Sequence, residues 1–193
     1  PTEAEFKALK NWLDEQINGT EEPEWIHLLM KLSCYTGMRL GEMVQIKWQR
    51  GPEDHGTGHS RGYVYLDSEE KTLTIKFKRK LRVIPVDHVW EVFEQLRKIR
   101  RPGNAYVFAS PQGSHYDESY VCRRWKKEVQ KVPGLSKPYT SHDIRHAVVT
   151  RLLRSNHSTH KVGKFVGHSS EQITEMYGHL MPSDLAGMAS DLT

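Results

Sequence analysis

Cysteine is scarce in this chain, because only Cys34 and Cys122 occur among its 193 residues and neither has a cysteine nearby. Two isolated cysteines provide neither a disulfide framework nor the paired ligands of a zinc ribbon. An HExxH box of the zinc-protease kind is absent as well. We therefore expect both thiols to be reduced and no metal or other cofactor to take part.

Long apolar runs are also lacking. No stretch approaches the roughly 18 apolar residues that a membrane-spanning helix needs, and the N-terminus lacks the basic and then apolar order of a secretory signal. Internal repeats, low-complexity segments and long linkers are missing too. We expect one soluble, cytoplasmic domain over residues 1–193, long enough to bury a sizeable core.

The charge balance is only mildly basic, with 28 Lys and Arg against 24 Asp and Glu and a net charge of +4. Basic side chains gather in three places, which are 76–82, 97–101 and 123–131. Such clusters can neutralise the phosphates of a nucleic acid. Taken singly, each cluster is better explained as the solvated face of a helix or a hairpin.

Apolar periodicity predicts a mainly α-helical fold with a small three-stranded antiparallel β-sheet, an α+β arrangement. Helical spacing covers 2–18 and 23–36, and a third, short helix runs through Leu40, Val44 and Ile46. A glycine-containing loop follows over 50–61, and then the period changes to two, which predicts strands at 63–66, 72–77 and 81–86. Further helices are expected at about 87–100, 116–131, 141–155, 160–166, 170–177 and 183–191.

Three short segments could carry chemistry: 36–42 with Arg39, 142–146 with His142 and Arg145, and Gly167-His168 with Tyr177 nine residues on. Residues three apart on a helix share a face, so an HxxR pair can present an imidazole and a cation to one group. An arginine keeps its charge and its planar fork matches two phosphate oxygens. Arg39 and Arg145 could therefore form a cradle for a phosphodiester.

Each of these residues also has a purely structural explanation. Arg39 could pair with Glu42 three residues on, His142 could cap a helix or lie buried, and Tyr177 could be one more packed aromatic among eight tyrosines. The functional interpretation therefore depends on the whole set and its order.

That set resembles the tyrosine recombinase (phage-type integrase) family: an arginine in T-G-x-R-x-x-E, a lysine in a β-turn, H-x-x-R, G-H, and a tyrosine nine residues beyond that histidine. The resemblance spans residues 36–180. It implies a catalytic domain in which Arg39, His142, Arg145 and His168 surround a scissile phosphate. It further implies that Tyr177 attacks that phosphate, keeps the 3′ phosphate and releases a 5′ hydroxyl, without a metal.

The resemblance also implies a lysine that protonates the leaving 5′ oxygen from the turn between the second and third strands. Lys78 is the first choice, Lys76 the alternative and Lys80 the third, because this turn is about one residue shorter than is usual in the family. The same lysines could instead contact the DNA backbone or block edge-to-edge pairing. We interpret His142 as the base for Tyr177 and His168 as a donor to a phosphate oxygen.

Double-stranded DNA is the implied partner, bound by a homo-oligomer, either a dimer or a tetramer, that assembles on it. We expect the chain to be a catalytic fragment without the family's N-terminal helical domain. Residues 181–193 could form a helix that links subunits or one that packs on its own core. Glu42 is expected to support Arg39, and Asp143 and His146 to serve their helix.

Other classes of protein remain open at this point. Type IB topoisomerases and telomere resolvases use a similar residue set, a relative could bind DNA without cutting it, and the 11 histidines allow a zinc-binding module. Formation of a covalent DNA adduct distinguishes the enzymes from the binding modules.

Overall fold

The computed structural model describes residues 1–51, 62–77, 80–168 and 176. Lys78, Tyr177 and the segment 181–193 therefore lie outside the described residues, as do the helices expected at 170–177 and 183–191 apart from Met176. The loop expected at 50–61 is described only at Arg50 and Gly51.

The described helices follow the apolar periodicity closely. They are α1 (Glu3–Asn18), α2 (Trp25–Thr36), α3 (Leu40–Val44), the 3-10 turn η2 (Asp87–Val89), α4 (Trp90–Lys98), α5 (Glu118–Val129), α6 (Ser141–Arg154) and α7 (Thr159–Val166). Side chains of Thr2, Asp117, Thr140 and Ser158 accept hydrogen bonds from backbone N–H groups at the starts of α1, α5, α6 and α7. These caps satisfy donors that have no partner within the helix.

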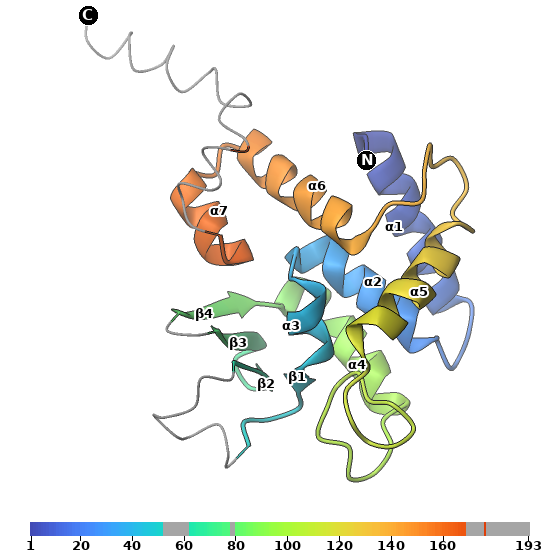
Figure 1. Ribbon diagram of the computed structural model, residues 1–193, viewed down its shortest axis with the longest axis vertical. Helices are drawn as coiled ribbons and strands as arrows, with labels where there is room; N and C mark the ends of the chain where they lie inside the picture. The colour runs from blue at the N-terminus through green and yellow to red at the C-terminus, as the bar shows by residue number, and fades with distance from the viewer. Residues whose placement is uncertain (52–61, 78–79, 169–175, 177–193) are drawn as a thin grey trace, which may run out of the picture.

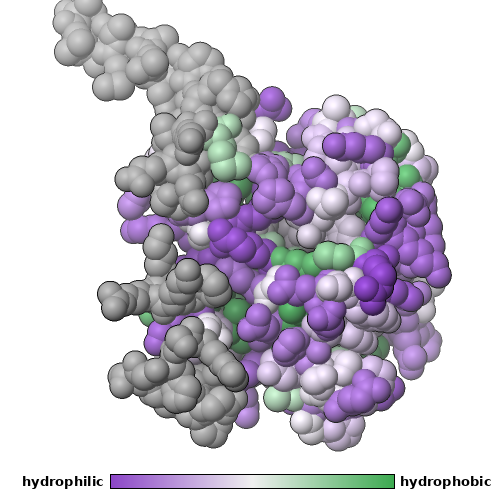
Figure 2. All heavy atoms as spheres, viewed as in Figure 1, coloured by the Kyte–Doolittle hydropathy of each residue, from purple (hydrophilic) through white to green (hydrophobic). Residues whose placement is uncertain are grey.

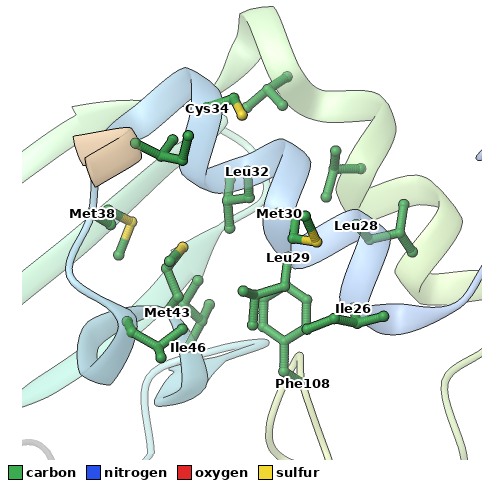
Figure 3. Close-up of a cluster of buried hydrophobic side chains, with 14 of the residues drawn as sticks. Ile26, Leu28, Leu29, Met30, Leu32, Cys34, Met38, Met43, Ile46 and Phe108 are labelled. Carbon is green, nitrogen blue, oxygen red and sulfur yellow. The ribbon is translucent and has the colours of Figure 1, made fainter. Parts of the chain in front are cut away.

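Helix α2 is the centre of the core, because α1, α3, α4, α5 and α6 all pack against it. Its side chains are buried on every face, including Leu28, Leu29 and Met30, which are fully buried. Figure 3 shows Phe108, from the loop before α5, lying beside Ile26 of this helix. A helix that is apolar all round is stable only when surrounded, which explains its central place.

A buried polar contact helps to attach α5 to α2. His27 Nε2 lies 3.1 Å from Glu128 Oε2, and both side chains are almost fully buried. Lys131 also contacts the Glu128 carboxylate, at 2.6 Å. Buried polar groups need such partners, because an unpaired one costs about 1 to 3 kcal/mol.

The sheet differs from the prediction in having four strands, in the order β1-β2-β3-β4. The strands β2 (Tyr63–Asp67), β3 (Thr72–Phe77) and β4 (Lys80–Pro85) pair antiparallel as expected. The additional strand, β1 (Ile46–Lys47), pairs parallel with β2, so the sheet is mixed and the expectation of three antiparallel strands was wrong. The helix expected to run through Ile46 ends at Val44.

The error has a physical reason. Two residues are too few to show the alternation that identifies a strand, and β1 is held by backbone partners that are distant in the sequence. On one side it pairs with β2, and on the other Val107 N donates to Ile46 O at 2.7 Å and Trp48 N to Ala105 O at 3.0 Å.

Figure 1 shows the sheet on one side of the helices, with α7 above the edge strand β4, and α7 and β4 are in contact. Strand β4 alternates between two environments. Ile84 is fully buried, whereas Leu81 and Val83 are 63% and 55% exposed. Arg82, which alternates with Leu81 and Val83, bonds Glu42 of α3.

Both cysteines are free, Cys34 buried in the core and Cys122 exposed, and burial raises the pKa of the Cys34 thiol to about 12. Within the described ranges, no helix combines the length and the apolar character needed to cross a membrane.

A pair of leucine substitutions tests the central role of α2. Leu29→Ala removes a fully buried side chain and is expected to lower the free energy of unfolding by about 2 to 5 kcal/mol. Leu81→Ala, the matched control on an exposed side chain, is expected to stay within about 0.5 kcal/mol. Urea denaturation followed by circular dichroism measures both, and equal losses would contradict this account of the core.

Candidate active site

The first site element begins where α2 ends. Gly37 follows the helix in the left-handed conformation, with φ of 58°, which glycine adopts at little cost. Space is also tight there, because an added Cβ would lie 3.1 Å from Val148 Cγ1 of α6. Arg39 follows two residues later at the start of α3. The tight turn thus places Arg39 at the junction of α2, α3 and α6.

The second site element repeats this arrangement. Helix α7 ends at Gly167, whose φ is 78°, and His168 follows directly. The two turns are also linked, because Arg39 Nη1 donates to the Gly167 carbonyl at 3.3 Å.

Arg145 makes the corresponding contact at the other turn. Its Nη1 donates to the Gly37 carbonyl at 2.6 Å, although the two residues are 108 positions apart. The side chain is 2% exposed, so its charge is held inside the protein. Carbonyls at a helix C-terminus lack intrahelical partners and carry partial negative charge, which favours a guanidinium there. Each of the two predicted arginines therefore holds the end of a helix that precedes another site residue.

Helix α6 supplies the histidines of the H-x-x-R-H segment. Thr140 and Asp143 form a capping box that starts the helix, so Asp143 serves the helix as expected. His142 and His146 lie one turn apart, and their Nε2 atoms are 2.7 Å from each other. At that distance one nitrogen donates and the other accepts, which makes the two rings a coupled pair.

The electrostatic environment of His168 shows that the positive charges converge on it. Burial, followed by the charges of Arg145 and Arg39, lowers the pKa of His168 to about 4, and His146 and His142 act in the same direction. The ring is therefore neutral at pH 7. Its Nδ1 is buried and has no hydrogen-bond partner among the described residues, which is unusual for a buried polar atom; in the tautomer that protonates it, this nitrogen can donate to an anion.

Glu42 is the acidic residue of this cluster. It accepts from the backbone N–H of Arg39 at 3.0 Å, and its Oε1 lies 3.6 Å from Arg39 Nη1. The salt bridge offered as the structural explanation of Arg39 therefore exists, but it is long, and the Arg39 side chain is still 48% exposed. Glu42 therefore supports Arg39 while the Arg39 side chain remains accessible.

A hollow of about 300 Å³ opens beside Arg39 between α3 and the ends of β2 and β3. Lys76, the alternative to Lys78, lines it together with Arg39 and Glu118. The Lys76 Nζ also lies 5.5 Å from the centre of the Tyr63 ring. Figure 2 shows that hydrophilic side chains gather on the face where α3, α6 and α7 meet.

The structure thus brings Arg39, His142, Arg145 and His168 into one region, while Lys78, Tyr177 and the side chain of Lys80 lie outside the described part. Two neighbours of the site were missed. His146 contacts His142, which their spacing of four could have indicated. Arg82 was grouped with DNA-facing lysines, yet its side chain is 14% exposed and bonded to Glu42.

In the described ranges, no three His, Cys, Asp or Glu side chains come close enough together to hold a metal ion.

This mainly helical domain gathers two arginines around His168, which is neutral at pH 7 and has an unpaired buried nitrogen. The sequence profile described as "Phage integrase family" matches residues 2–183. The chain therefore belongs to the phage integrase family, and the resemblance to tyrosine recombinases is confirmed.

Individual relatives of the chain are also named as integrases or recombinases. An integrase/recombinase of Escherichia coli is 27% identical over 201 residues, which cover 86% of this chain and 57% of that protein. Tyrosine recombinase XerD of Listeria monocytogenes is 28% identical over 162 residues, covering 79% of this chain and 49% of XerD. The chain thus spans about half the length of the curated relatives it matches.

Among solved structures, the XerH site-specific recombinase in a post-cleavage complex with its palindromic difH substrate shares the fold. The TM-score is 0.67 at 22% identity, over 98% of this chain and 52% of that one.

The lowered pKa of His168 leads to a prediction about stability. Between about pH 6.5 and pH 4 the unfolded state binds a proton on this histidine and the folded state does not. Stability therefore falls as the pH falls through this window. We expect the parent to lose more stability between pH 7 and pH 5 than His168→Gln does, by on the order of 1 kcal/mol. Urea denaturation at both pH values measures this, and equal losses would contradict it.

Proposed function

We propose that this chain is the catalytic domain of a site-specific DNA recombinase, which cuts and rejoins double-stranded DNA through a covalent 3′-phosphotyrosine on Tyr177. The observation that carries the proposal is the convergence of Arg39 and Arg145 on His168, whose Nδ1 is buried without a partner. Membership of the phage integrase family supports the choice of a DNA phosphodiester as the anion.

The proposed chemistry is a transfer of the phosphoryl group. The Tyr177 oxygen bonds to phosphorus, the bond from phosphorus to the 5′ oxygen breaks, and the tyrosine proton passes to His142. Arg39, Arg145 and His168 donate to the nonbridging oxygens, which carry more negative charge in the transition state than in the ground state. Rejoining reverses these steps with a 5′ hydroxyl from another strand.

The 5′ oxygen leaves as a hydroxyl only if it gains a proton, and we assign that proton to Lys78. Its place in the hairpin after β3 puts it two residues beyond Lys76, which shares a hollow with Arg39. Lys76, which lies on β3, is the alternative.

The proposed partner is double-stranded DNA, bound inside the cell by a homo-oligomer. A palindromic substrate of the kind that XerH binds has two-fold symmetry, which two copies of a protein match. Residues 181–193 are the proposed link between such copies.

A selection experiment tests the proposed nucleophile. The protein is incubated without metal with nicked duplexes whose central segment is randomised. The protein is then denatured, and the DNA that remains attached to it is sequenced. The parent is expected to retain a distinct set of sequences covalently, whereas Tyr177→Phe, which lacks only the attacking oxygen, is expected to retain none. Adduct formation by Tyr177→Phe, or no adduct from a parent that binds the DNA, would contradict the proposal.

The lysine assignment is tested with a substrate that carries sulfur in place of the bridging 5′ oxygen. A thiolate leaves without needing a proton, since thiols ionise several pH units below alcohols. Lys78→Ala is expected to cut the oxygen substrate about 100-fold more slowly or worse, and to recover most of the rate on the sulfur substrate. Lys76→Ala and Lys80→Ala are the matched controls, and recovery shown by either in place of Lys78→Ala would reassign the acid.

A further inference from the structure

Arg82 lies on the buried face of β4, and its side chain contacts the site. It is not among the residues predicted from the sequence. Its Nη2 donates to Glu42 Oε2 at 2.8 Å. The side chain is 14% exposed, so this is a shielded contact in which an ion pair is screened little by salt. Arg82 therefore attaches the hairpin of β3 and β4 to helix α3.

The same guanidinium fits against the end of α7. A Cβ added to Gly167 would lie 1.7 Å from Arg82 Nη1, so the arginine fills the space that a side chain at position 167 would need. Arg82 and Arg39 consequently meet the same two groups, because Arg39 also contacts Glu42 and donates to the Gly167 carbonyl.

The two arginines share the Glu42 carboxylate unequally. Oε2 accepts from Arg82 at 2.8 Å and from the backbone N–H of Arg39 at 3.0 Å. The Arg39 guanidinium is left with the longer 3.6 Å contact to Oε1, and its side chain stays 48% exposed. One carboxylate between two guanidinium groups also leaves one positive charge unbalanced.

We propose that Arg82 is a positioning residue that keeps Glu42 from neutralising Arg39, so that the Arg39 guanidinium remains available to the phosphate. Without Arg82, the carboxylate can turn to Arg39 and form the paired hydrogen bonds that arginine and carboxylate favour. The inference rests on the proposed function for the identity of the phosphate, and it assigns Arg82 no contact with DNA.

Rescue by a second substitution tests the inference. Arg82→Met keeps an unbranched apolar stem and removes the guanidinium, and it is expected to lower the maximal rate of covalent adduct formation about tenfold or more. Adding Glu42→Gln removes the carboxylate that captures Arg39 but keeps an oxygen for its backbone N–H. The double variant is expected to recover most of the rate.

Arg151→Met is the matched control, because Arg151 Nη2 also bonds a carboxylate at 2.8 Å, that of Glu3 at the start of α1. It is expected to react at the parent rate. A parent rate in Arg82→Met, or a double variant as slow as Arg82→Met, would overturn the inference, since a merely structural ion pair gives no rescue. If Arg82→Met unfolds, Arg82→Gln, which also lacks the charge, is judged by the same two criteria with and without Glu42→Gln.

A second measurement does not depend on catalysis. The NMR signal of Arg39 Nε, identified with Arg39→Lys, is followed while inorganic phosphate is added. Arg82→Met is expected to raise the half-saturating phosphate concentration about tenfold and Glu42→Gln to reverse the change; unchanged titrations would overturn the inference. A parent that binds phosphate at Arg39 but forms no adduct would count against the proposed function alone.

Discussion

The site depends on two helix ends whose carbonyls are held by arginines from elsewhere in the chain. Gly37 and Gly167 each end a helix in the left-handed conformation, and their carbonyls accept from Arg145 and Arg39 respectively. These contacts join residues 108 and 128 positions apart. Because each turn also leads into a site residue, the same hydrogen bonds hold the helices together and fix where the charges lie.

Concentrating positive charge in one place is unfavourable unless the fold compensates for it. Here the surrounding core is rigid, since α2 is buried on every face and contacts five other helices. Glu42 offsets part of the charge, and the low pKa of His168 avoids adding a further cation. The remaining positive charge is held in place by the fold, so the anion proposed above would bind with little rearrangement.

Much of this arrangement could be predicted from the sequence. Helices α1, α2, α5, α6 and α7 follow from apolar periodicity, and Arg39, His142, Arg145 and His168 follow from their order and spacing. The structure brings these four into one region, while their chemical roles remain proposals. Their helices carry clear local signals, such as the capping box at Thr140 and the glycine that ends α7.

What could not be predicted has long-range causes. Strand β1 is two residues long and exists because distant backbone groups pair with it. Arg82 stands in a run of basic residues, and only the pairing of β4 with β3 turns its side chain toward Glu42 while its neighbours Leu81 and Val83 face outward. Local composition carries no information about which face of an edge strand will be covered.

The contact between Arg82 and Gly167 also constrains how such sequences can diverge. The guanidinium occupies the volume of the missing side chain, so a side chain at position 167 would require this guanidinium to move, in addition to adopting the left-handed backbone that glycine favours there. A relative with a side chain at the position of Gly167 has to place the guanidinium elsewhere, which would change its contact with the carboxylate of Glu42. A change at position 167 would therefore reach the carboxylate beside Arg39 through a residue 85 positions away in the chain.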